Sequence, residues 1–406
     1  MVNVLEAQDL DLVDAIPIDP GAAQAMRRGG LLARLATSQA MVYVFRFLAA
    51  PVLTGAARFL ERKVAEGLVR IAAPEPESWQ YVADEAALPL PGGRPARVLL
   101  LVHGTFSSTV GSFGALAGQP EGQAFLRSAL ASYDLVLGYD HPTLSVLPSE
   151  NAGELARRLE RIPFAEPPEV DAISYSRGGL VLRSLVESIL PTAPLALRMR
   201  RAIFVGATNG GTELANPANW RRLADRYTNL AAAGARAAAL IPGFAATGVM
   251  LASAIRGVGV LVKVLAASAV TDQAVPGLAA MEPGGPFVRE INGRQPGQPG
   301  PQQMDYRAIT SDFDPDTARA SADPAVLPPG LLLHLADKGA DALYGKPNDL
   351  VVNVDSMTDI DPALGDFVRD VFPFGTNGKV HHCAYFSQPE TARHLMQWLL
   401  PVAARG

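Results

Sequence analysis

The segment from Val170 to Arg183 constrains the fold of this chain most strongly. Its apolar first half predicts a buried strand, its second half predicts a helix, and Ser176 lies at the turn between them. A turn that presents a serine hydroxyl beside a base tolerates only small residues two positions away on either side. Ser174 and Gly178 occupy those positions, and Gly179 follows. The pattern therefore predicts a nucleophilic serine, and a Ser/Gly-rich connection without chemistry is the alternative.

A second apolar run, Arg97–Val102, lies upstream and is followed by His103 and Gly104. Such a run is typical of a strand buried on both faces that opens into a glycine-containing loop. Acyl transfer needs two backbone N–H groups for the oxyanion, one after the nucleophile and one from a loop of this kind. Arg177 is the first candidate, and Thr105 or Phe106 is the second. We expect His103 to orient the loop and not to act as a base.

These segments resemble those of the α/β-hydrolase superfamily, and within it the bacterial lipase-like serine hydrolases, over roughly residues 95 to 400. Residues 202–215 resemble the strand and loop that follow the serine turn in lipases. Residues 347–357 resemble the segment that supplies the triad acid, and residues 380–386 the segment that supplies the histidine. The resemblance implies an α/β fold, with a mostly parallel sheet flanked by helices, and the triad order Ser, Asp, His.

The resemblance favours Asp349 as the acid and His382 as the base, and the sequence offers rivals for both. Asp312 and Asp314 follow a strand-like run and could also end next to the site, although their Asp/Pro-rich surroundings are typical of a solvated turn. His381 is adjacent to His382 and remains an alternative base. The implied triad is therefore Ser176, Asp349 and His382, with these three rivals open.

Composition narrows the class of protein further. The chain has 406 residues, of which 49% are hydrophobic and 18% charged, so it can bury a large core. The net charge of −5 and the lack of a basic stripe argue against a nucleic-acid partner. The single cysteine, Cys383, excludes an intramolecular disulfide and a multi-cysteine metal site. No phosphate-binding or dinucleotide-binding motif occurs, so we expect neither a cofactor nor a metal.

The N-terminal part is expected to be a helical extension. Residues 31–71 have an apolar helical pattern, and arginines at positions 46, 58 and 62 interrupt any run of bilayer length. The first basic residue is Arg27 and several acidic residues precede it, which argues against a signal peptide. We therefore expect a cytoplasmic protein, with peripheral membrane contact as an alternative, and a division into residues 1–90 (extension and linker) and 91–406 (hydrolase domain).

An insertion rich in Ala, Gly and Val occupies residues 217–298. The stretch from Ala237 to Ile255 carries no charge, but Pro242 and Gly243 interrupt it, which argues against a membrane span. Lipase-like relatives insert a helical cap or lid at this point of the chain. The resemblance therefore implies a cap whose apolar side chains line an acyl pocket.

Together these features predict a serine hydrolase that cleaves carboxylic esters, in the manner of a lipase or esterase, with an apolar acyl group and a small-molecule ester or lipid as substrate. One alternative is a hydrolase-fold module that binds a partner or a membrane and has a vestigial site. Another is an amidase or peptidase, because fold and triad are shared across these chemistries. The oligomeric state and the natural substrate stay open at this point.

Overall fold

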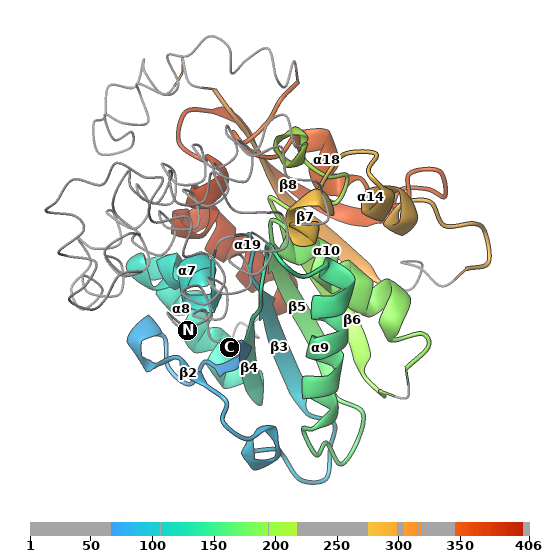
Figure 1. Cartoon of the computed structure of the whole chain (residues 1–406). Helices are drawn as coiled ribbons and strands as arrows, with labels where there is room; N and C mark the ends of the chain where they lie inside the picture. Colours follow the sequence, from blue (N-terminus) through green and yellow to red (C-terminus); the bar gives the residue numbers. More distant parts are fainter. Residues whose placement is uncertain are drawn as a thin grey trace, which may run out of the picture.

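A computed structural model describes residues 66–105, 107–193, 195–216, 275–298, 304–314, 317 and 346–400. These residues build one eight-stranded sheet in the order β2-β1-β4-β3-β5-β6-β7-β8 (Figure 1). The neighbouring strands from β4 through β8 pair in parallel, and β1 pairs antiparallel with both β2 and β4. This mostly parallel sheet, with its strand order and flanking helices, confirms the predicted α/β-hydrolase fold.

The strands are short apolar runs, as a sheet covered on both faces requires. Their bounds are β1 Gly67–Arg70, β2 Gln80–Tyr81, β3 Arg97–Val102, β4 Leu135–Asp140, β5 Glu169–Tyr175, β6 Arg198–Val205, β7 Asp305–Phe313 and β8 Val368–Asn377. In β3 every residue after Arg97 is buried, and β4 is buried throughout. These two strands and β5 therefore form the centre of the sheet.

The longest helices of the described residues are α8, α9 and α19, and each begins with a proline at the first helical position, where no backbone donor is lost. The α-helices of the described residues are α7 Thr109–Phe113, α8 Pro120–Ser132, α9 Pro148–Glu160, α10 Gly178–Arg183, α13 Pro276–Ala279, α14 Pro286–Ile291, α18 Val354–Thr358 and α19 Pro389–Leu399. A π-helical turn, η4 Ser184–Ile189, continues α10. The 3₁₀ turns are η1 Pro76–Ser78, η2 Glu85–Ala87, η3 Gly114–Gly118, η5 Glu213–Ala215 and η9 His382–Ser387.

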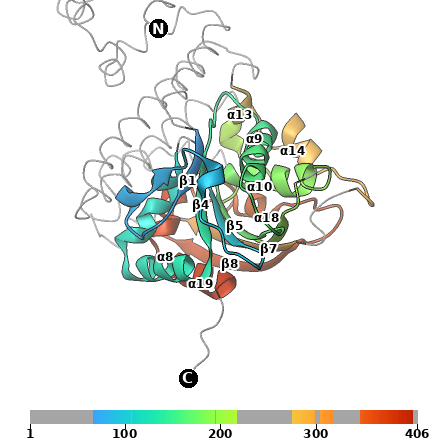
Figure 2. The ribbon, with the colours of Figure 1, turned by 90° about the horizontal axis from the view of Figure 1, so that it is seen from below.

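Two hydrophobic cores lie on the two faces of the sheet. Helices α9 and α10 cover one face, and α8 and α19 cover the other (Figure 2). Because side chains alternate along a strand, Leu100 of β3 joins the core under α9 and α10, whereas Leu99 and Leu101 join the core under α8 and α19. The sheet is thus the middle layer of a three-layer sandwich, and this packing fixes the carboxyl ends of β3, β5 and β7 relative to one another.

The N-terminal boundary of the sheet differs from the prediction. Residues Gly67–Arg70 form strand β1 and not the end of a helix, and they pair with β4 from Leu137 to Asp140. Leu68 and Val69 point into opposite cores, which only an extended backbone allows. A short apolar run fits a helix or a strand equally well, and the pairing with β4 decides between them. The sheet therefore begins well before residue 91.

Several predicted segments lie outside the described residues, namely the N-terminal extension up to residue 65 and most of the insertion, 217–274. The charge-free stretch 237–255 is among them. Within the described part of the chain, no helix has both the length and the apolar character to cross a bilayer.

Candidate active site

Ser176 occupies a sharp turn between β5 and α10. Its φ is 55°, a left-handed backbone conformation that residues other than glycine rarely adopt. A methyl group at Gly178 would lie 2.3 Å from the Val102 carbonyl oxygen, and one at Gly179 would lie 2.8 Å from the Ala207 Cβ. Larger residues at these positions would push the helix away from the sheet. The small residues of the predicted turn are therefore a packing requirement.

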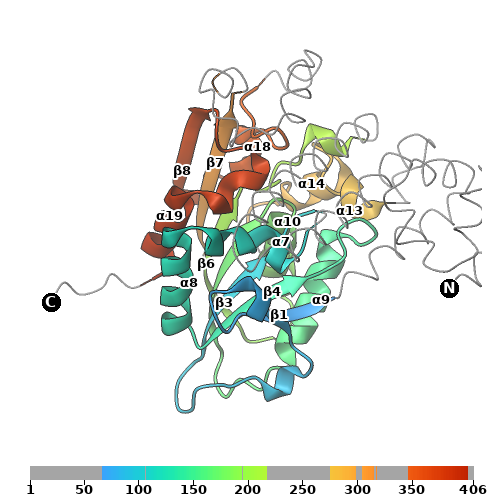
Figure 3. The same ribbon diagram turned by 90° about the vertical axis from the view of Figure 1, so that its left-hand side faces the viewer.

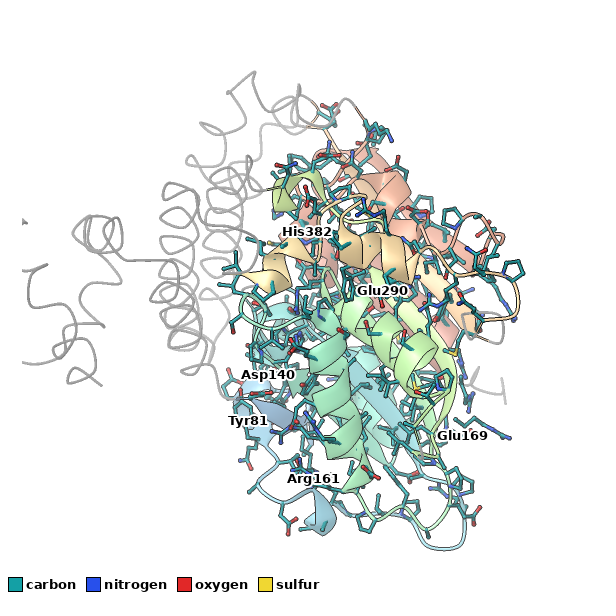
Figure 4. All side chains as sticks on the ribbon, turned by 45° about the vertical axis from the view of Figure 1, so that its right-hand side comes forward. Tyr81, Asp140, Arg161, Glu169, Glu290 and His382 are labelled. Carbon is teal, nitrogen blue, oxygen red and sulfur yellow. The ribbon has the colours of Figure 1, made fainter. Side chains whose placement is uncertain are left out.

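Ser176, His382 and Asp349 form a chain of hydrogen bonds. The His382 Nε2 lies 2.9 Å from the Ser176 Oγ, and the His382 Nδ1 lies 2.7 Å from the Asp349 Oδ2. All three side chains are fully buried. Figure 4 shows His382 well separated from Glu169, where β5 begins. The structure thus brings together the three side chains favoured by the sequence, at the carboxyl ends of the strands.

The Asp349 carboxylate is fixed by its own loop. Its Oδ1 accepts the backbone N–H groups of Val351 at 3.1 Å and Val352 at 2.8 Å. Asp312, a rival for the acid, instead accepts the backbone N–H of Asn348 at 3.1 Å. Asp312 therefore braces the loop that carries Asp349.

The other rivals have different surroundings. The carboxylate of Asp314 accepts the backbone N–H of Thr317 at 3.3 Å and the hydroxyl of the same residue at 2.5 Å. His381 lies edge-on to the ring of Phe313, 5.9 Å between centroids. Burial lowers the pKa of His381 to about 4, so its imidazole is neutral at ordinary pH. The position within hydrogen-bonding distance of the Ser176 Oγ is held by His382.

The loop after β3 packs directly against Ser176, because a methyl group at Gly104 would lie 2.7 Å from the Ser176 Cβ. The His141 N–H donates to the His103 Nε2 at 3.1 Å, so the His103 proton is on Nδ1, which donates to the Gly104 carbonyl at 2.8 Å. In a trans peptide the C=O and the following N–H point in opposite directions. The N–H of Thr105 therefore points away from the His103 ring.

Asp140, at the end of β4, holds the far end of the loop after β3, where α7 begins. Its Oδ1 accepts both the backbone N–H and the hydroxyl of Thr109, each at 2.6 Å, at the start of α7. Its Oδ2 accepts the Tyr81 hydroxyl at 2.5 Å, and Figure 4 shows the two side chains next to each other. Phe106, the second candidate for the oxyanion donor in this loop, lies outside the described residues.

The side chain of Arg177 has a structural role that the sequence did not indicate. It is fully buried, with Nε donating to the Gly277 carbonyl at 3.1 Å and Nη2 to the Val146 carbonyl at 2.6 Å. Gly277 belongs to α13, which lies near α10 (Figure 3). The Met281 carbonyl accepts the Thr212 N–H at 2.7 Å. Residues 275–281 thus dock on the loops around Ser176. No local sequence pattern indicates that an arginine side chain will be buried and bonded to backbone carbonyl groups.

Within the described residues no metal site is indicated, and Cys383 is not a reactive thiol. The structure shows no group of three or more His, Cys, Asp or Glu side chains there that could hold a metal ion. Burial raises the pKa of the Cys383 thiol to about 12, which keeps it protonated and weakly nucleophilic. The described arrangement is therefore suited to nucleophilic catalysis by a serine hydroxyl with an imidazole base and a buried carboxylate.

Comparison with solved structures gives low similarity. Lipase 1 from Pelosinus fermentans is 13% identical, with a TM-score of 0.47, over 77% of this chain and 100% of the other. Lipase BlEst2 from Bacillus licheniformis, in its propeptide form, is 16% identical, with a TM-score of 0.40, over 78% and 52%. Phospholipase PlaB from Legionella pneumophila is 13% identical, with a TM-score of 0.36, over 64% and 45%. The chain spans about half the length of the last two proteins.

No curated protein matches the sequence. A family model described as "Domain of unknown function (DUF7379)" matches residues 66–400. This range begins one residue before β1, includes all eight strands of the sheet and ends just after α19. Since the match covers most of the chain, the protein belongs to the DUF7379 family.

Proposed function

We propose that the protein is a serine hydrolase that cleaves carboxylic esters through an acyl-enzyme. The observation that carries the proposal is the hydrogen-bonded chain from Ser176 Oγ through His382 to Asp349, with distances of 2.9 and 2.7 Å. A buried serine on a strained turn, next to a base that is itself oriented by a carboxylate, is the arrangement that makes a hydroxyl nucleophilic.

In this mechanism the Ser176 Oγ attacks the ester carbonyl carbon while His382 Nε2 accepts the hydroxyl proton. Collapse of the tetrahedral intermediate breaks the C–O bond to the alcohol, and His382 returns the proton to the leaving oxygen. Water, activated by the same imidazole, then releases the carboxylic acid. Asp349 keeps the Nδ1 proton in place and stabilises the imidazolium that forms in each half-reaction.

Two backbone N–H groups are assigned to the oxyanion. One belongs to Arg177, directly after the nucleophile, and the other to Thr105. The orientation of the Gly104 carbonyl toward His103 turns the Thr105 N–H away from that ring, which supports Thr105 as the donor in the loop. The role of Phe106 in this loop remains the alternative prediction.

An apolar acyl group is favoured by the apolar side chains at the described end of the insertion, of which Met281 lies next to Thr105. Val275, Leu278 and Met281, in the described end of the insertion, are buried. The Met281 Sδ lies 3.6 Å from the Thr105 Oγ1. Acyl chains need concave, largely apolar walls, so these residues support an ester with an apolar acyl group.

A panel of p-nitrophenyl esters, the matching thioesters and anilides tests the proposal and separates it from amidase activity. We expect ester hydrolysis by the wild type, and loss of about 10⁴-fold or more in kcat for Ser176→Ala. Ser184→Ala is the matched control, because Ser184 is a buried serine further along the same helical segment whose hydroxyl donates to the Leu180 carbonyl at 2.7 Å. Anilide hydrolysis faster than ester hydrolysis, or an active Ser176→Ala, would overturn the proposal.

A further inference from the structure

The Asp349 carboxylate has a side-chain partner in addition to His382. Its Oδ2 accepts the Tyr385 hydroxyl at 3.0 Å, and the same oxygen accepts the His382 Nδ1 at 2.7 Å. The other oxygen, Oδ1, already accepts two backbone N–H groups. Each carboxylate oxygen thus accepts two hydrogen bonds, so the acceptor capacity of this fully buried side chain is satisfied within the protein.

The local backbone explains why Tyr385 reaches this oxygen. His382 and Tyr385 are three residues apart in the 3₁₀ turn η9, and in a 3₁₀ helix side chains at this spacing project from the same side. The Tyr385 ring is enclosed, because a methyl group at Gly206 would lie 2.7 Å from its Cε2. The turn therefore directs the imidazole and the phenol to one acceptor.

The proton of this hydrogen bond belongs to the phenol. Burial and the negative charge of Asp349 hold the pKa of Tyr385 well above its usual range, and a backbone contact from Ser311 offsets this only in part. The phenol therefore stays protonated and donates to the carboxylate. A donor to a carboxylate withdraws negative charge from the oxygen that faces the imidazole.

We propose that Tyr385 is a positioning residue for the catalytic acid, one that fixes the Asp349 carboxylate toward His382 and moderates its negative charge. The inference rests on the proposed function, since the imidazole is taken to be the base. The titratable groups that face or adjoin the imidazole are Asp349, Tyr385, Tyr175, His381 and Cys383.

Tyr385→Phe removes the hydroxyl and keeps the ring. Without the donor, Asp349 carries more negative charge toward the imidazole, so the imidazolium form is favoured and the base is available only at higher pH. We expect the acid limb of the kcat/KM profile to move up by roughly half a pH unit to one unit. We also expect kcat to fall about 10-fold with little change in KM.

Tyr133→Phe is the matched control. Tyr133 is also a buried tyrosine that donates to a carboxylate, Asp171, at 2.7 Å, near the start of β5 and away from Ser176. The Tyr133→Phe change should lower the melting temperature and leave the pH profile of kcat/KM unchanged. If Tyr385→Phe also lowers only the melting temperature, with kcat within about twofold of wild type and an unmoved acid limb, the residue is structural and the proposal is wrong.

Two measurements cover the remaining outcomes. If Tyr385→Phe does not fold, 3-fluorotyrosine can replace Tyr385. This residue keeps the hydroxyl and makes it a stronger donor, so it should move the acid limb to lower pH. An unmoved limb overturns the proposal.

If the wild type hydrolyses no ester, the proposed function fails by itself. The low-field NMR resonance of the proton between His382 and Asp349, identified by its loss in His382→Ala, then tests Tyr385. It should move further downfield in Tyr385→Phe, and an unchanged resonance contradicts the inference.

Discussion

At the scale of single residues, the site depends on very close contacts between backbone segments. Gly104 and Ser176 belong to different loops, yet a methyl group at Gly104 would lie 2.7 Å from the Ser176 Cβ and 3.1 Å from the Tyr175 carbonyl oxygen. Real Cβ atoms do not approach another carbon to 2.7 Å, so either Ser176 or the loop after β3 has to move. A displacement of about 1 Å in such a site is costly to the rate.

Gly104→Ala should therefore lower kcat/KM by about 10²-fold while the protein still folds. Gly153→Ala is the control, since nothing lies within 4 Å of the added methyl group and Gly153 is inside α9. That change should leave activity intact and raise the free energy of unfolding by about 0.5–1 kcal/mol. Steady-state kinetics and urea unfolding of both variants check this. Full activity in Gly104→Ala would show that close packing of the loop after β3 against Ser176 is not required.

The residues of the site differ in how far the sequence predicts them. The spacing of small residues around Ser176 and the segments with Asp349 and His382 are local patterns, and the structure brings the three side chains together. The buried side chain of Arg177 and the hydroxyl of Tyr385 have roles that depend on partners distant in sequence. No local pattern encodes such partners, so these roles cannot be predicted from the sequence.

At the scale of elements, a buried ionic cluster joins the helical segment after Ser176 to the end of the insertion. Arg183 of α10 is fully buried and lies 2.9 Å from Glu187. Arg294 lies 2.6 Å from Glu187 and 2.9 Å from Asp361, and the Tyr306 hydroxyl donates to Glu187 at 2.8 Å. Two cations and two anions thus share one buried volume, and this cluster fixes residues 291–294 against η4.

Arg183→Met should destabilise the fold by about 3–5 kcal/mol, because it leaves buried carboxylates with one cation fewer. Arg393→Met removes an exposed pair with Glu390 of 3.0 Å and should change stability by less than about 1 kcal/mol. Urea unfolding measures both. The double variant Arg183→Met, Glu187→Met should recover part of the lost free energy of unfolding. If Arg183→Met is as stable as Arg393→Met, the buried cluster does not contribute to stability.

The elements show where sequence patterns are sufficient. The long apolar run of β3 and the strand–turn–helix around Ser176 lie where the sequence predicts them. The strand formed by residues 67–70 is not predicted, because four residues are too few to distinguish a helical period from an extended one. Their pairing with β4, from a distant part of the chain, determines the strand. The predicted cap helices up to residue 274 lie outside the described part of the chain and stay a prediction.

At the scale of the whole molecule, two buried histidines link stability to pH. Burial, with the nearby His103 and Arg177, holds the pKa of His141 well below its usual range, and burial lowers that of His381 to about 4. In the unfolded chain a histidine binds a proton near pH 6.5. The unfolded state therefore binds more protons between pH 6.5 and 4, and stability is lost as the pH falls through this window.

Each histidine should contribute a slope of up to about 1.4 kcal/mol per pH unit in that window. Urea unfolding at pH 7 and pH 5, on the wild type and on His381→Gln, isolates one of the two contributions. The variant should lose less stability than the wild type between the two pH values. An equal loss in both proteins would mean that His381 is protonated in the folded state, contrary to its burial.

Covalent labelling shows whether Ser176 is an activated nucleophile, on which the proposed function depends. A fluorophosphonate reacts only with a serine whose oxygen is activated by a neighbouring base. We expect one adduct per chain by intact mass, located to Ser176 by peptide mapping. It should be absent in Ser176→Ala and form far more slowly in His382→Ala. No adduct on the folded wild type, or an adduct that persists in Ser176→Ala, would contradict the activation of Ser176.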